Sequence, residues 1–322
     1  RIPDETVREL RASELLRIGV PKMFGGLDAE YRLMFEIGSL LGSACAATSW
    51  CFCIWAAHSW LVGHWPYKAQ QEVFGSSPDV LSSSSLNPGK STLEETSGGF
   101  KLSGHWEFSS GSDSAEWVIV GANRSDRLVW ILVPHLDYEI ADTWFVSGLK
   151  GTGSKDIVIK DIFVPEHRIL DFQQAGNGDW TGWEIHKQER YRVPIPVLLG
   201  WDLVTPMLGI AQGAIEEFTY KLTGTSGPGR TADSEGVHLR LSQSSAELDA
   251  AQALMNEDIT QIFKKAKTGD AFSTIERAKI RRDKAFIAQT CLSAVNRLFE
   301  FSGGHGIFES GLLQRFHRDI QA

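Results

Sequence analysis

The sequence is poor in cysteine, and the cysteines it has do not form a metal or disulfide pattern. Cys45, Cys51 and Cys53 share one apolar stretch, and Cys291 stands alone. No CxxC pair occurs, and the spacing suits neither a zinc site nor a disulfide framework. We therefore expect buried, reduced thiols, no metal site and a reducing compartment such as the cytoplasm.

Clustered positive charge is also missing. Lys and Arg number 32 against 40 Asp and Glu, so the formal net charge of the chain is −8. Nucleic-acid binding needs clustered Lys and Arg to neutralise phosphates. We therefore expect no nucleic-acid partner.

Charged residues of either sign are absent from residues 37–67. A run of this length could span a bilayer, which takes ~20 residues. However, it contains His58, His64, several serines and three glycines, and histidines inside a bilayer are costly. We predict a pair of buried helices in a large protein and no membrane segment.

The motifs of several enzyme classes are absent. No GxSxG, HExxH or paired CxxC occurs, so nothing supports a hydrolase or a metalloenzyme. The glycine-rich residues 148–154 precede a strand, whereas a nucleotide-binding glycine loop follows a strand and opens a helix. We read this segment as a loop.

Three regimes of hydrophobic periodicity follow one another along the 322 residues. The N-terminal part has helical patterns, including Glu5–Ile18 and a second region from Glu30 to Trp65. Alternating, strand-like segments fill residues 78–170, and helical periodicity returns from Pro206, with Ser273 and Glu276 as a capping box. We predict an α+β fold in which a β-barrel or sandwich lies between N-terminal helices and a C-terminal four-helix bundle.

The predicted domain boundaries follow these changes of period. They are an N-terminal helical domain at 1–75, a β domain at 76–185 and a C-terminal bundle at 186–322. Helical patterns run up to both chain ends, so we expect further residues beyond each of them. No signal peptide is visible.

Three polar motifs stand out against apolar surroundings. Ser109-Ser110-Gly111 follows the alternating strand that contains Trp106 and Phe108; it is either an ordinary strand-to-turn signal or one wall of a site for a flat aromatic ligand. Residues 82–85 are four serines, which suit a flexible linker or a short strand. His58 lies in an apolar helix, where it is either a hydrogen-bonded core residue or a base.

Taken in order, these segments resemble the acyl-CoA dehydrogenase superfamily. Within it they are most similar to the oxygenase components of two-component flavin monooxygenases, such as 4-hydroxyphenylacetate and secosteroid hydroxylases. The segments that carry the resemblance are PKMFGGL, TSWCFCIWAAHSW, AQQEVFG, LSSSSLNP, GHWEFSSGSDSAEW, WFVSGLKGTGSKDIVIKDIFVPEHR and LQRFHRD. They cover nearly the whole chain.

The resemblance implies roles for particular residues. It implies His58 as a pocket histidine that deprotonates a phenol and Ser110 as the hydroxyl near the flavin N5 atom. The residues that the resemblance implies for flavin binding are Trp50, Ser84, Ser85, Phe108, Ser109, Ser110, Gly304 and His305. A further family histidine falls beyond Ala322, and His317 is not its match. The flavin-phosphate arginine is not assigned, because neither Lys221 nor Arg230 aligns securely.

The resemblance also implies the reaction and its partners. Reduced FMN or FAD (FMNH2 or FADH2) comes from a separate NAD(P)H-dependent flavin reductase and reacts with O2 to form a flavin C4a-hydroperoxide. The protein keeps this adduct dry, and the adduct hydroxylates a small aromatic, phenolic substrate. Relatives are homotetramers, so a homotetramer is expected here.

Two alternatives stay open at this stage. One is an acyl-CoA dehydrogenase that uses a carboxylate to remove an α-proton, for which Glu309 lies one residue out of register. The other is a fold relative that oxygenates nitrogen or sulfur, or that binds flavin without catalysis.

Overall fold

The structure is a computed structural model that describes residues 1–27, 29–173, 181–224 and 234–322. Its N-terminal region contains α1 (Asp4–Ala12), α2 (Arg32–Ala44), α3 (Ala46–Val62) and α4 (Tyr67–Phe74), with the 3₁₀ turns η1 (Leu15–Ile18) and η2 (Lys22–Phe24). The second predicted helical region is two helices, because the backbone is extended at Cys45 (φ −151°, ψ 106°).

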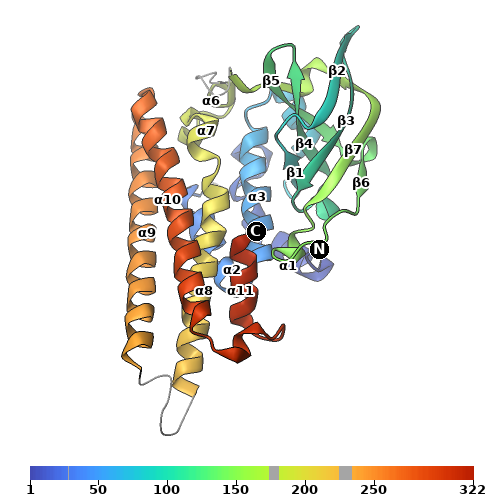
Figure 1. Cartoon of the computed structure of the whole chain (residues 1–322). Coiled ribbons are helices and arrows are strands. Elements are labelled where there is room, and N and C mark those ends of the chain that lie inside the picture. The colour runs from blue at the N-terminus through green and yellow to red at the C-terminus, as the bar shows by residue number, and fades with distance from the viewer. Residues whose placement is uncertain (28, 174–180, 225–233) are drawn as a thin grey trace.

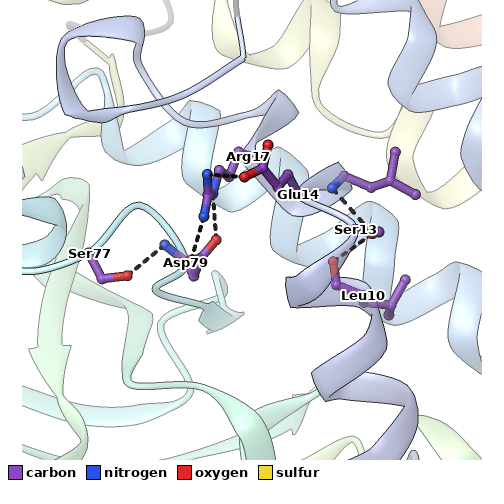
Figure 2. Close-up of polar contacts among 7 residues, drawn as sticks. Leu10, Ser13, Glu14, Arg17, Ser77 and Asp79 are labelled. Carbon is purple, nitrogen blue, oxygen red and sulfur yellow. Dashed lines mark hydrogen bonds and ion pairs between the residues drawn. The ribbon is translucent and has the colours of Figure 1, made fainter.

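The helix predicted over Glu5–Ile18 is wrong in its second half. It ends at Ala12, and Glu14 takes a left-handed conformation (φ 60°). The turn at Glu14 positions Arg17, which donates two hydrogen bonds, of 2.7 and 2.9 Å, to the carboxylate of Asp79 just before the first strand (Figure 2). The apolar stripe continues across the break, since Leu16 and Ile18 are buried, so periodicity alone does not reveal it.

Helix α3 is buried on nearly every side, and of its residues only Thr48 and Trp50 retain appreciable exposure. It packs against α2, α8 and β1, as Figure 1 shows for the helix labelled near the centre. The prediction of two buried helices is therefore confirmed for α3 only, because α2 buries one face (Met34, Phe35, Gly38 and Gly42) while Leu40 is 73% exposed. Among the described residues, one helical stretch, Ile195–Thr223, is long and apolar enough to cross a membrane, and 67% of its most apolar window is buried inside the protein.

The middle of the chain forms two four-stranded sheets. One sheet has the order β1 (Ser82–Ser85), β4 (Trp117–Arg124), β5 (Arg127–Pro134), β8 (Ile169–Asp171), and the other β2 (Lys90–Thr96), β3 (Gly99–Ser109), β7 (Lys155–Pro165), β6 (Glu139–Ala141). β1 is parallel to β4, and the other neighbours are antiparallel. Of the two predicted arrangements, the structure shows the sandwich.

The two faces of the first sheet pack against different partners. Val118 and Val120 of β4 join Leu102 and Trp106 of β3 in the core between the sheets. Ile119 of β4 points the other way, into the core that contains α3. β1 thus lies between a helix layer and a second sheet, which explains why four consecutive serines form a strand rather than a tether.

The C-terminal region is helical again. Its helices are α6 (Thr181–His186), α7 (Ile195–Leu198), α8 (Trp201–Gly224), α9 (Glu235–Thr268), α10 (Thr274–Glu300) and α11 (Leu312–Gln321). The predicted capping box is present at the start of α10, with reciprocal hydrogen bonds between Ser273 and Glu276. α8 begins before Pro206 and packs along both α2 and α10, so the bundle is continuous with the N-terminal helices (Figure 1).

Four aromatic rings pack together where α3 meets the segment before α8; they belong to Trp60, His64, His186 and Tyr191. His64 lies in this cluster, 97% buried, and neither of its ring nitrogens has a hydrogen-bond partner among the described residues. Its ring packs edge-on against Trp60 and Tyr191, with centroids 4.9 and 5.3 Å away. Burial is the main cause that lowers the pKa of His64 to about 3, and the nearby His186 lowers it further.

We expect His64→Phe to make the protein more resistant to acid. Above pH 6.5 the ring is neutral in both the folded and unfolded states. As the pH falls from 6.5 toward 3, the unfolded chain binds a proton that the folded state excludes, so folding stability drops. The pH midpoint of acid unfolding, followed by circular dichroism, should move to a lower value in the variant. His135→Phe, at an exposed histidine, is the control and should leave it unchanged.

Candidate active site

A cavity of about 310 Å³ lies where α3, β1 and the end of β3 meet. Three larger hollows, two along α9 of about 430 and 530 Å³ and one beside Arg124 of about 370 Å³, contain none of the predicted site residues, so size alone does not select a site. Small-molecule sites usually measure roughly 300–1,000 Å³. The predicted site residues that line the smaller cavity are Trp50, His58, Ser84, Ser85, Phe108 and Ser110.

A β-bulge at the end of β3 turns Phe108 and Ser110 toward this cavity. The pairing of β3 with β7 shifts register between Trp106 and Ser109. Strict alternation would place Phe108 beside Trp106 in the core between the sheets. Instead Phe108 is 66% exposed and left-handed (φ 65°), while Ser109 is fully buried and is absent from the cavity lining. A bulky residue with positive φ is strained, and such strain concentrates at functional sites.

A chain of hydroxyl groups runs behind Ser110. The Trp50 indole N–H donates to Ser110 Oγ at 3.1 Å, Ser110 Oγ lies 2.8 Å from Ser154 Oγ, and Ser154 Oγ lies 2.7 Å from Thr152 Oγ1. Thr152 donates its proton to the carbonyl oxygen of Leu149 at 2.9 Å.

One assignment of the hydroxyl protons makes every contact in this chain a hydrogen bond, because a hydroxyl has one proton and a carbonyl oxygen only accepts. In this assignment Thr152 donates to Leu149, so Ser154 donates to Thr152. Ser110 must then donate to Ser154 while it accepts from Trp50. One lone pair of Ser110 remains, and Ser110 therefore faces the cavity as a hydrogen-bond acceptor.

His58 has its tautomer fixed by the backbone of β1. Its Nδ1 lies 2.7 Å from the carbonyl oxygen of Ser82, so Nδ1 carries the proton and donates. Nε2 is then an acceptor, and the Ser84 hydroxyl 3.0 Å away donates to it. Burial lowers the pKa of His58 to about 4, although the bond to Ser82 acts in the opposite direction. The ring is neutral at pH 7 and reaches the cavity through Ser84.

The tail helix α11 holds the glycine-rich loop against the cavity. The Asp319 carboxylate accepts the Leu149 N–H at 2.7 Å, and Arg318 donates to the carbonyl oxygen of Ser147 at 3.2 Å. Leu149 adopts a left-handed conformation (φ 48°) and lines the cavity. These contacts connect the C-terminal helix to the loop that lines the cavity.

Several predicted residues lie away from the cavity in this chain. Gly304 is exposed, with nothing within 4 Å of an added Cβ atom, and it does not line the cavity. The side chain of His305 and all of Arg230 lie outside the described residues. Glu309, the base of the dehydrogenase alternative, is exposed and outside the cavity lining, and His317 stacks on Phe299 with ring centroids 4.0 Å apart. The flavin roles of Gly304 and His305 stay predictions.

The sequence interpretation missed Thr152 and Ser154 of the hydroxyl chain and Asp202, which lines the cavity. The first two lie in the glycine-rich segment, whose hydroxyls flank Gly153 with its left-handed backbone (φ 53°). Two hydroxyls in a tight loop that resembles a family segment were a usable signal. Asp202 gave no local signal, since an acidic residue in the first turn of a helix is ordinary.

Comparisons with known proteins agree with this arrangement. Residues 203–322 match the acyl-CoA dehydrogenase C-terminal domain family. The whole chain is 30% identical to HsaA, the oxygenase subunit of a flavin-dependent monooxygenase from Rhodococcus jostii, and covers 86% of it. It is also 34% identical to the oxygenase component of an FADH2-dependent resorcinol hydroxylase from a Rhizobium species, of which it covers 83%.

The chain belongs to this family of flavin-dependent monooxygenases. The crystal structure of 3-HSA hydroxylase from Rhodococcus sp. RHA1 matches the fold of this oxygenase with a TM-score of 0.95 and 30% sequence identity, over 100% of this chain and 85% of the other. The predicted family, its enzymatic activity and its dependence on flavin are thereby confirmed, as is an acyl-CoA dehydrogenase-like fold that mixes helices and strands.

The cavity of the oxygenase fits a flavin ring by its chemistry. Trp50, Phe108 and Trp144 supply flat apolar surface, and the Phe108 and Trp144 rings meet edge to face at 6.1 Å. Ser110 supplies an acceptor for a ring N–H. Flat aromatic walls with a few directed polar groups are how cofactor sites are built.

We expect Phe108→Gly to separate stability from activity. Left-handed strain costs roughly 1–2 kcal/mol, whereas the added freedom of glycine in the unfolded chain costs roughly 0.5–1 kcal/mol. Stability to urea should therefore hold or rise slightly, while product formed per reduced flavin falls because one wall is lost. Ser125→Gly changes a residue with similar backbone (φ 57°) outside the cavity lining and should leave product yield unchanged. An equal loss of product per reduced flavin in the Phe108→Gly and Ser125→Gly variants would contradict the role of Phe108.

Proposed function

We propose that the oxygenase hydroxylates a phenol, with reduced flavin bound against Ser110 and the phenol hydroxyl directed at Ser84 and His58. The observation that carries this proposal is the chain of hydroxyl contacts behind Ser110, since the proton assignment that uses all of them leaves Ser110 as an acceptor facing the cavity. Reduced flavin presents a matching donor, its N5–H group. A reduced flavin held there would supply the two electrons that activate O2, so that one oxygen atom of O2 enters the ring and the other leaves as water.

The other predicted flavin-binding residues would act as walls and supports. Trp50 and Phe108 flank the ring, and the Ser85 hydroxyl donates to the Glu107 carbonyl oxygen at 2.7 Å, which ties β1 to the end of β3. The dry helix layer behind Trp50 keeps bulk water from the reacting atoms, which strengthens the hydrogen bonds inside the site. We propose that Ser109 contributes to the flavin site through its backbone, since its side chain is fully buried and does not line the cavity.

The low pKa of His58 shapes its proposed role. A phenol has a pKa near 10, about six units above that of His58, so complete proton transfer to the imidazole is unfavourable. We propose instead that the substrate hydroxyl donates to Ser84 Oγ while Ser84 donates to His58 Nε2. This relay increases negative charge on the phenol oxygen and makes the ring carbon more nucleophilic.

The remaining proposals concern partners and organisation. We propose that a separate NAD(P)H-dependent reductase supplies FMNH2 or FADH2, since the relatives are oxygenase components or subunits. We also propose a cytoplasmic homotetramer; large apolar side chains exposed on the C-terminal region, such as Ile275, Phe286 and Ile307, support assembly through the bundle. The division into domains at 1–75, 76–185 and 186–322 is part of the same proposal.

Ser110→Ala and Ser109→Ala form a matched pair of neighbouring serines. We expect Ser110→Ala to lower product per reduced flavin and to raise H2O2 release, because the acceptor for the flavin is lost. Ser109→Ala removes a fully buried hydroxyl that has no partner among the described residues, so yield should not change. Product and H2O2 are measured after mixing reduced FMN or FAD with oxygen and a phenol. If both variants lose yield equally, the assignment of Ser110 is wrong.

A double-mutant cycle tests the relay. His58→Asn keeps a donor for the Ser82 carbonyl oxygen but removes Nε2, and Ser84→Ala removes the intervening hydroxyl. Because the two groups act in series, we expect each single variant to lower the hydroxylation rate and the double variant to lower it little further. The rate of product formation in single turnovers is the measurement. Additive losses would show that Ser84 and His58 act separately.

A further inference from the structure

The charge of the cavity wall has one sign. Among the described residues that line the cavity, the charged side chains are Glu107 and Asp202, and none is Lys or Arg. Glu107 is exposed, so solvent screens its charge. Asp202 is 96% buried, so its field inside the cavity is screened much less.

Asp202 approaches the cavity from the helical side. It lies in the first turn of α8 between Leu199 and Leu203, which also line the cavity, whereas Ser110 and Ser154 lie on the β side. Its Oδ1 accepts the Gly200 N–H at 2.5 Å. A carboxylate offers about four acceptor positions, so this bond leaves acceptor capacity for a ligand.

Helix capping alone does not account for the position of Asp202. An Asp in a first turn stabilises a helix when it is exposed as well, and burying a carboxylate is costly unless it gains partners. The positive charge that acts on Asp202 is that of Lys284 on α10, whose ammonium group donates to the carbonyl oxygens of Val197 (2.9 Å) and Leu199 (2.7 Å). Burial raises the pKa of Asp202, with Lys284 acting in the opposite direction.

We propose that Asp202 determines substrate specificity by accepting a hydrogen bond from a second hydroxyl group on the phenol ring. This inference rests on the proposed function, since the first hydroxyl is directed at Ser84. Leu199 and Leu203 pack against the ring edges, and Asp202 binds the polar group at its far end. The substrate class is then an uncharged aromatic diol or polyol. An aromatic carboxylate is rejected, because it would bring a second negative charge to Asp202 in a site shielded from water.

The test uses two probes that differ at one position of the ring, resorcinol and 3-hydroxybenzoate. Each is supplied to the full oxygenase with reduced flavin and O2, and kcat/KM for hydroxylation is measured. The wild type should prefer resorcinol by at least about 100-fold, as expected when a buried polar group selects its partner. Asp202→Asn keeps an oxygen for the Gly200 N–H and removes the charge, so the preference should fall at least about tenfold.

Glu216→Gln is the matched control, because it removes an exposed carboxylate from the same helix outside the cavity, and the preference should not change. A wild type that uses both probes equally, or an Asp202→Asn protein that folds and keeps the wild-type preference, overturns the inference while the proposed function stands. The wild-type preference needs no variant, so a poorly folding Asp202→Asn protein does not remove the test. A wild type that hydroxylates no phenol overturns the proposed function and this inference together.

Discussion

A strand can direct its side chains to two faces only, and the oxygenase depends on one interruption of that rule. The register shift between Trp106 and Ser109 keeps Trp106 in the core between the sheets, yet it sends Phe108 and Ser110 to the cavity. Without the bulge, Phe108 would join the core and Ser110 would lose its contact with Trp50. The strain at Phe108 is tolerated because pairing with β7 resumes at once and α3 packs behind the strand end.

Two backbone carbonyl oxygens then set the polarity of the whole site. The carbonyl of Leu149 takes the proton of Thr152, and the carbonyl of Ser82 takes the Nδ1 proton of His58. In the proton assignment that uses every contact, Ser110 accepts a hydrogen bond from the cavity side and Ser84 donates to His58 Nε2. The cavity is therefore polarised before any ligand enters, which is what preorganisation of a site means in electrostatic terms.

The sequence was informative where a pattern is local. Alternation located the long strands, helical periodicity located the late helices, and Ser273 with Glu276 marked a true capping box. Three of the seven family segments pointed to the cavity, since their residues Trp50, His58, Ser84 and Ser110 converge there. Periodicity could not reveal the left-handed turn at Glu14, because buried leucine and isoleucine continue on both sides of it.

What escaped the sequence depends on contacts between distant segments. Ser154 and Thr152 belong to the site only because Ser110, some forty residues away, contacts Ser154. Asp202 belongs to it only because the start of its helix is buried. The direction of the hydroxyl chain also needed distances, because composition says nothing about which oxygen holds a proton. Likewise, the exposed position of Gly304 follows from how the chain leaves α10, which no motif encodes.

The burial of α3 has a consequence for how ligands enter and leave. A helix packed on nearly every side cannot shift without opening several cores at once, so it forms the immobile floor of the cavity. The opposite rim contains Phe108, 66% exposed, and Trp144, which is followed by Phe145 at 83% exposure. Under the proposed function, flavin and substrate would pass this aromatic rim, whose exposed rings can rotate on timescales much shorter than a catalytic cycle.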